Sequence, residues 1–235
     1  MVWQSPEGMD EYLKPTRLCD CDNVRVREKA KDIVNGAETP KEAALKIFYF
    51  VRDEILFGLD YPDAKASHTL RKQIGQCFTK SNLQIALLRA VGIPARCHYA
   101  HIASSELVKD ITPRFMRSRM PRAMGHPWCE CYLSEKWIAC EALRDKALFE
   151  GRLKKGLIPK EQIPPTIDWD GETDFILSKP IIVEDVGTFP SSDEMLEFIA
   201  KEEKGKVSMP PKLPRVLISF VFSFPNWRIN RMRKG

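Results

Sequence analysis

The chain has 235 residues, of which 43% are hydrophobic and 29% are charged, and its formal net charge is +5. This length suffices for one principal hydrophobic core, and the longest largely apolar run, residues 216–224, is too short for a membrane-spanning helix of roughly 20 residues. Seven cysteines at irregular spacing in a chain of this size favour free thiols over a disulfide-stapled fold.

The positive charge is concentrated at the C-terminal end. Residues 210–235 hold six basic residues and no acidic one, so residues 1–209 carry a net charge of −1. No basic face for nucleic acid is therefore expected in the main body. The basic tail could contact an anionic membrane surface, although a terminal strand or helix docked on its own domain is the preferred prediction. The first residues lack a basic region followed by an apolar one, so we expect a cytoplasmic protein without a secretory signal.

Two amphipathic helices are predicted in the first quarter of the chain. Asp22 can cap a helix over residues 23–35, which Gly36 ends. Thr39 and Glu42 form a capping-box pattern at the start of a second helix, which runs to about residue 55. The chain thus begins with helical structure.

A third helix follows an irregular connection. Residues 58–74 are mixed in composition and are expected to lack regular structure. Residues 78–91 carry apolar side chains at helical spacing, and Gly92 and Pro94 end that helix. Cys77 therefore lies at the N-terminal end of a largely buried helix.

Cys77 is a candidate nucleophile because of this position. Unpaired backbone N–H groups and the helix dipole favour negative charge there, and the thiolate is the reactive form of cysteine. The alternative is that Cys77 is a small buried apolar residue. A nucleophilic thiolate also needs a base and a group that orients that base. Of the four histidines, His126 is the strongest candidate for the base, because Gly125 and Pro127 bracket it at the start of a strand.

Strands are predicted after the third helix. Residues 95–103 form one strand, residues 109–124 a basic connection, and residues 126–133 and 137–143 a hairpin. Beyond residue 150 the prolines indicate a turn-rich segment, and Ser191 with Glu194 caps one further helix that runs to about residue 204.

The hairpin geometry selects candidates for the orienting carboxylate. With a two-residue loop at 134–135 or 135–136, His126 and Glu141 lie on the same face of the hairpin. A three-residue loop would turn the second strand over. Glu130 lies on the same face as His126. Asp145 would fall on this face by the same alternation, but it lies beyond the predicted end of the second strand. The same alternation sends Cys129, Cys131 and Cys140 to the opposite face, where core packing is favoured over a zinc site because no C-x-x-C pair or fourth ligand is evident.

Three stretches resemble the transglutaminase-like superfamily, which has a papain-like cysteine fold: "ALKIFYFVRDEILFG", "GQCFTKSNLQIALLRAVGIPAR" and "HPWCECYLSEKWIACEALRD". The resemblance covers residues 40–150, and "WDGETD" extends it to about residue 175 for bacterial and archaeal members. It implies an α+β fold in which N-terminal helices and the nucleophile-bearing helix pack on an antiparallel sheet. We expect a helical extension over residues 1–38, a catalytic domain over 39–180, and a C-terminal helix with basic tail over 181–235.

The resemblance also implies roles for individual residues. Cys77 takes the place of the nucleophile and His126 that of the general base. Glu141 stands where aspartate is usual, and a subgroup pattern points instead to Asp145. The implied function is a cysteine enzyme that cleaves or transfers the acyl group of a peptide or protein amide through a thioester; the alternative is a non-catalytic peptide- or protein-binding module on the same fold. No cofactor is expected, and activity should be metal-independent because the sequence lacks a D-x-[DN]-x-[DN]-G calcium loop.

Overall fold

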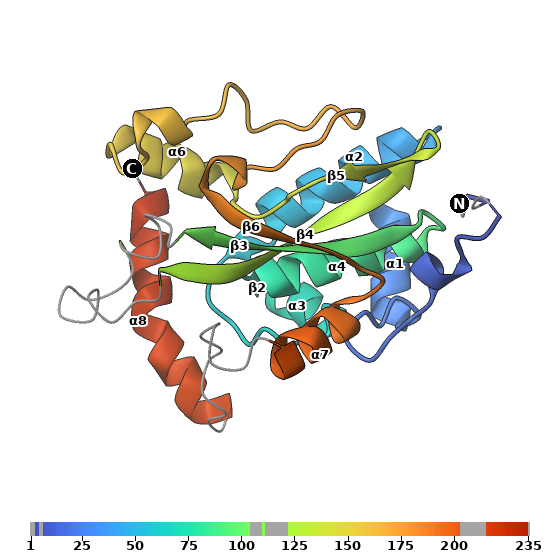
Figure 1. Ribbon diagram of the computed structural model, residues 1–235, viewed down its shortest axis with the longest axis horizontal. Helices are drawn as coiled ribbons and strands as arrows, with labels where there is room; N and C mark the ends of the chain where they lie inside the picture. The colour runs from blue at the N-terminus through green and yellow to red at the C-terminus, as the bar shows by residue number, and fades with distance from the viewer. Residues whose placement is uncertain (1–2, 5–6, 104–109, 111–121, 203–214, 235) are drawn as a thin grey trace.

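The fold is α+β, as predicted, with helices packed around one antiparallel sheet (Figure 1). The computed structural model describes residues 3–4, 7–103, 110, 122–202 and 215–234. The sheet has the strand order β5-β4-β3-β6, and each neighbouring pair is antiparallel. Its strands are β3 (Ala95–Ala103), β4 (Ala123–Leu133), β5 (Lys136–Ala139) and β6 (Ile182–Phe189). The strand predicted over residues 95–103 is confirmed, and most of the predicted connection over 109–124 lies outside the described residues.

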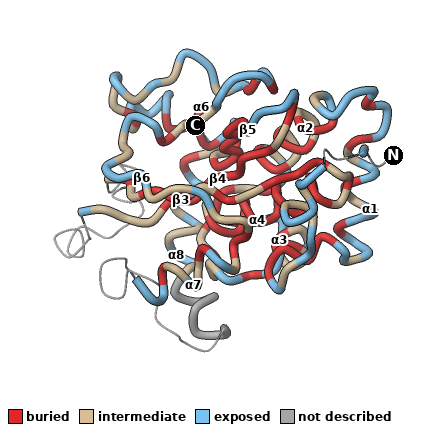
Figure 2. Tube along the Cα trace, turned by 45° about the vertical axis from the view of Figure 1, so that its right-hand side comes forward, coloured by how far each residue is buried: buried red, intermediate tan, exposed pale blue. Residues whose placement is uncertain are grey.

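Helix α4 is the central helix of the molecule. It packs against β3 and β4 and is surrounded by the other helices of the N-terminal half. These elements are α1 (Val24–Ile33), α2 (Pro40–Tyr49), α3 (Ala66–Lys72) and α4 (Cys77–Ala90). Figure 2 shows the buried residues concentrated on α4 and on the strands that it contacts. The predicted helix over residues 78–91 is therefore confirmed, and it begins at Cys77.

The first two helices differ from the prediction only at their ends. Asn23, not Asp22, caps α1, and its side chain accepts a hydrogen bond from Arg25 N at 3.0 Å. Thr39 caps α2 as predicted, but the Glu42 carboxylate accepts from Glu38 N and not from the Thr39 backbone. Beyond Tyr49 the helix widens into a π-helical turn, η2 (Phe50–Glu54).

The prediction of an irregular connection over residues 58–74 is wrong in part. Helix α3 occupies residues 66–72, and a short parallel pair of strands, β1 (Leu56–Phe57) and β2 (Ile74–Gly75), brackets it. Asp20 stabilises the start of α3, because its carboxylate accepts hydrogen bonds from Ser67 N at 3.0 Å and Ser67 Oγ at 2.6 Å. This cap comes from a distant part of the chain, so the local sequence does not reveal it.

The two faces of the sheet have different neighbours. Cys97, Cys129 and Cys131 face the main core, which they share with α4 and with Cys140. Trp128 and Ala100 face the other side, where they pack with Ala139. The cysteines of the hairpin are thus core residues, in agreement with the packing interpretation.

The C-terminal part contains helices η4 (Lys160–Gln162), η5 (Lys179–Ile181), α6 (Lys146–Lys154), α7 (Ser192–Glu202) and α8 (Arg215–Arg233). Ser191 caps α7 as predicted, since Glu194 N donates to its hydroxyl at 3.3 Å. Helix α8 packs against α6 along one end of the sheet (Figure 1), as the docked-tail interpretation expects. Among the described residues, no helix combines the length and apolar character needed to cross a bilayer. The domain boundaries at residues 38 and 180 stay a prediction, and β6 beyond residue 180 belongs to the same sheet as β3.

Candidate active site

Cys77 is the first residue of α4, and Gln76 caps that helix. The Gln76 side-chain oxygen accepts hydrogen bonds from Cys77 Sγ at 3.1 Å and from Phe78 N at 3.4 Å. Thr79 Oγ1 in turn accepts from Gln76 N at 3.0 Å. Cys77 is partly exposed and lies where the helix dipole favours negative charge. The predicted position of Cys77 at a helix N-terminus is therefore what the structure shows.

His126 lies on β4 and is 2% exposed. Its Nε2 lies 2.9 Å from Glu141 Oε1, and Cys77 is close enough to act on the pKa of the ring. Burial lowers the pKa of His126, but the charge of Glu141, the interaction with Cys77 and the hydrogen bond to Glu141 outweigh burial and raise the pKa well above its ordinary value. These interactions favour the protonated imidazole.

A two-residue hairpin loop brings His126 and Glu141 together. Ser134 and Glu135 form the loop with positive φ angles of 49° and 61°, the backbone that tight hairpin turns need. Leu133 then pairs with Lys136 across the hairpin. The loop at residues 134–135 is one of the two two-residue loops that the sequence predicts. It places Glu141 on the same side of the hairpin as His126.

Glu141 is held by the segment that follows the hairpin. Its backbone N–H donates to Phe175 O at 2.9 Å, and its Oε2 accepts from Ser178 N at 2.9 Å and Ser178 Oγ at 3.0 Å. Burial raises the pKa of Glu141, but the charge of His126 and these hydrogen bonds outweigh it and lower the pKa. Glu141 is thus an ionised, buried carboxylate with both oxygens engaged. Ser178 carries no sequence signal for this role, because it lies 37 residues further along the chain.

Asp145 lies elsewhere, although it is only four residues from Glu141. It caps α6 by accepting from Leu148 N at 3.0 Å, and it also accepts from Phe57 N at 3.0 Å. Arg233 of α8 forms a bidentate pair with it, with distances of 2.8 Å and 2.6 Å. Both oxygens of Asp145 are therefore engaged between β1, α6 and α8.

Glu130 shares the predicted face with His126 but turns to other partners. Its oxygens lie 2.7 Å from Arg96 Nε and 2.7 Å from His98 Nδ1. Trp128 stands between the two histidines, since its ring stacks on His98 at 4.3 Å and lies 6.1 Å from His126. Among the hydrogen bonds of the described residues, only Glu141 of the three predicted carboxylates joins His126.

A separate cavity of about 860 Å³ lies between α1, α3 and α8. Its lining has five lysine and arginine side chains and two aspartates, but it does not include Cys77, His126 or Glu141. The floor holds Asp60, which is buried and paired with Lys72 at 2.8 Å. Sequence reasoning did not identify this cavity, because α3 was predicted to be an irregular connection.

Comparison with known proteins bears on the superfamily and the fold. Residues 27–142 match the model of the transglutaminase-like superfamily core. No curated protein matches the chain. A candidate cysteine protease from Cytophaga hutchinsonii has a similar structure, with a TM-score of 0.51 and 19% identity over 81% of this chain and 50% of that chain. Its likeness supports the fold, and this chain spans half the length of that protein.

Two further structures match more weakly. A candidate protease from Parabacteroides distasonis has a TM-score of 0.39 and 12% identity over 58% of this chain and 25% of that chain. Red sea bream transglutaminase has a TM-score of 0.34 and 15% identity over 59% of this chain and 26% of that chain.

Proposed function

Because the chain carries a transglutaminase-like domain over residues 27–142, we propose that Cys77, His126 and Glu141 are a catalytic triad that acts on amides through a thioester. The observation that carries the proposal is the position of the His126 ring, which is hydrogen-bonded to the buried carboxylate of Glu141 and close enough to Cys77 for the two side chains to interact. A nucleophile, a base and a group that orients the base are the parts that covalent catalysis requires.

The glutamate in place of the usual aspartate is compatible with this role. Glu141 reaches Nε2 of His126 at 2.9 Å, and Ser178 fixes its second oxygen from the backbone and the hydroxyl. The ionised carboxylate fixes the ring orientation and favours the imidazolium. The imidazolium and the helix N-terminus together stabilise negative charge on the Cys77 sulphur.

The reaction follows from these charges. The Cys77 thiolate attacks the amide carbonyl carbon, the C–S bond forms, and the C–N bond breaks as the imidazolium of His126 protonates the leaving amine. Neutral His126 then takes a proton from water or from a second amine, whose attack on the thioester gives an acid or a new amide and releases the thiolate. The Cys77 backbone N–H, in the first turn of α4, is placed to donate to the carbonyl oxygen during both attacks.

The substrate class in this proposal is a peptide or protein amide. Support comes from the superfamily, whose members are generally cysteine-dependent enzymes, and from the candidate protease with the similar fold. Hydrolysis and acyl transfer share the first half of the reaction and differ only in the acceptor of the acyl group.

Site-selective alkylation tests the triad without knowledge of the substrate. We expect iodoacetamide to label Cys77 first among the seven cysteines at pH values below about 8.5, the ordinary pKa of a free thiol. Peptide mass spectrometry measures each site. The other six cysteines are buried and serve as internal controls, and His126→Ala should slow only Cys77.

The outcome separates an enzyme from a binding module. Slow labelling of Cys77 in folded protein, unchanged by His126→Ala, would contradict the triad and favour a non-catalytic module that uses the fold to bind a peptide. Selective labelling justifies a screen of amide substrates, with Cys77→Ala as the inactive reference.

A further inference from the structure

Helix α8 has an inner stripe that fastens it to the domain. The Asn226 side chain accepts from Leu59 N at 2.7 Å and donates to Leu59 O at 3.1 Å. One turn later Ile229 is fully buried, and Arg233 pairs with Asp145. These residues recur at the spacing of one helix face, so this end of α8 is rigidly docked.

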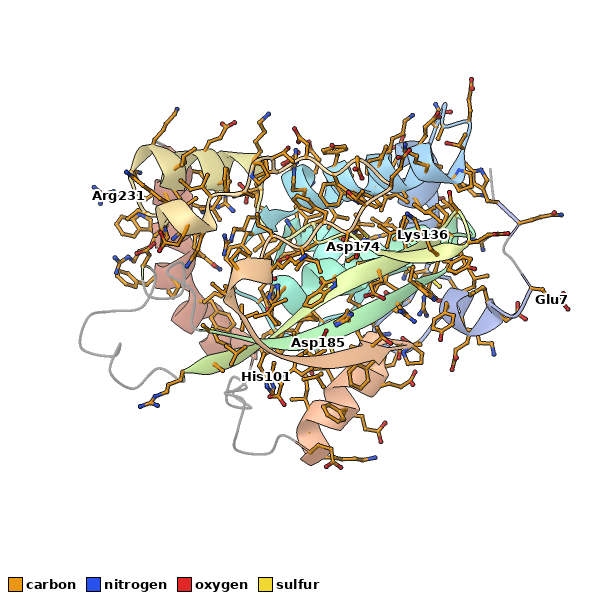
Figure 3. The ribbon with its side chains drawn as sticks, turned by 45° about the horizontal axis from the view of Figure 1, so that its top comes forward. Glu7, His101, Lys136, Asp174, Asp185 and Arg231 are labelled. Carbon is orange, nitrogen blue, oxygen red and sulfur yellow. The ribbon has the colours of Figure 1, made fainter. Side chains whose placement is uncertain are left out.

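The opposite stripe of α8 faces away from the domain. Phe224, Trp227, Arg228 and Arg231 follow the i, i+3, i+4, i+7 spacing of one helix face. Phe224 is 51% exposed and Trp227 is 55% exposed. Their rings stack with centroids 6.0 Å apart, and Figure 3 shows Arg231 at the outer edge of the molecule. Large aromatic side chains exposed side by side mark an interaction site.

Basic groups surround the two rings. The Arg228 guanidinium lies 5.9 Å from the centre of the Phe224 ring, and that of Arg231 lies 5.6 Å from the Trp227 ring. Lys155, just beyond α6, joins them at a shallow groove of about 400 Å³. Among the described residues that line this groove none is acidic. We call Phe224, Trp227, Arg228, Arg231 and Lys155 the aromatic–basic surface.

We propose that the aromatic–basic surface docks on an anionic membrane surface, with α8 lying in the plane of the lipid headgroups. Tryptophan and phenylalanine partition into the headgroup region, and arginine beside them attracts anionic lipid. In sequence the helix continues upstream with Val216–Val221, which is apolar except for Ser219, and an acidic protein partner would not require such a run. Helix α8 lies along one flank of the domain (Figure 1).

Vesicle sedimentation with the full chain tests this proposal. We expect binding to vesicles of equal parts phosphatidylcholine and phosphatidylglycerol, weaker binding to pure phosphatidylcholine, and release at high salt. Phe224→Ser with Trp227→Ser should lower the partition coefficient by about tenfold or more. Arg228→Gln and Arg231→Gln should each lower it by about fivefold.

A control variant on another helix tests whether any loss of vesicle binding is specific to the aromatic–basic surface. Val24→Ser with Arg25→Gln removes an exposed apolar side chain, 65% exposed, and a basic one from α1, and should leave vesicle binding unchanged. Urea unfolding verifies that each variant is folded. Undiminished binding by Phe224→Ser/Trp227→Ser, or no binding of the folded chain to anionic vesicles, overturns the proposal. Binding to polyglutamate but not to anionic vesicles would assign the surface to an acidic protein instead.

Discussion

Glu141 and Asp145 are two buried carboxylates four residues apart, and they belong to different parts of the molecule. Glu141 contacts His126 and Ser178, whereas Asp145 contacts Phe57, Leu148 and Arg233. Each has a lowered pKa because hydrogen bonds and a nearby cation outweigh burial. The two carboxylates are thus similar in charge and burial but differ in their surroundings: Glu141 lies in a hairpin near Cys77, and Asp145 caps a helix.

The largest effect should come from Glu141→Gln. This substitution keeps the side-chain volume but removes the charge that raises the pKa of His126, so the imidazolium is lost at lower pH. We expect a drop of up to about 30-fold in the rate of Cys77 alkylation at pH 7, because a thiol of ordinary pKa 8.5 is still about 3% thiolate there, and of about 10²-fold in turnover once a substrate is known. In a pH profile of turnover, the alkaline limit set by the imidazolium of His126 should move to lower pH, and the rise of alkylation with pH should move to higher pH. An unchanged rate and profile would exclude Glu141 as the orienting group.

Asp145→Ala should have the complementary effect. It leaves Arg233 without its carboxylate partner and α6 without its cap, so the free energy of unfolding should fall by about 3 kcal/mol. Urea unfolding measures this loss. The rate of Cys77 alkylation in the folded variant should stay close to that of the wild type, and a rate as low as in Glu141→Gln would make Asp145 the third catalytic residue.

The sequence predicts the position of Glu141 beside His126 but not the partners of Asp145. The face shared by His126 and Glu141 follows from the two-residue period of a strand and the parity of the loop, both of which are local properties of the sequence. The partners of Asp145 are not local, because Phe57 and Arg233 each lie 88 residues away. The same reason explains why α3 and Ser178 were missed: Asp20 and the segment after Phe175 supply the decisive hydrogen bonds from a distance.

Lys80 is a buried lysine whose pKa is affected by the charge of Asp145. This buried lysine donates to the backbone oxygens of Arg52 and Ile55. Burial lowers its pKa to about 7, although the charge of Asp145 acts to raise it. Between pH 7 and the unfolded value of about 10.4, the unfolded chain binds more protons than the folded one, so Lys80 makes stability rise with pH by about 1 kcal/mol per pH unit.

Lys80→Met should remove this rise, and denaturant unfolding at a series of pH values measures it. Asp145→Asn, by removing a negative charge, should lower the pKa of Lys80 and start the rise at lower pH. Identical slopes in Lys80→Met and the wild type would mean that the lysine is not desolvated in the native protein.

The smallest effect should come from Ser178→Ala, which tests how tightly Glu141 must be held. The variant removes the hydroxyl donor at 3.0 Å but leaves the Ser178 backbone donor at 2.9 Å, so one of two hydrogen bonds to Oε2 is retained. Because the other bond persists, we expect the loss of this one to cost about 1.5 kcal/mol, the lower end of the range for a bond to a charged group, and Cys77 alkylation to slow by about tenfold. Ser178→Thr keeps a hydroxyl and should restore the rate. If the Ala variant were as slow as Glu141→Gln, the position of the carboxylate, and not its charge alone, would determine the state of His126.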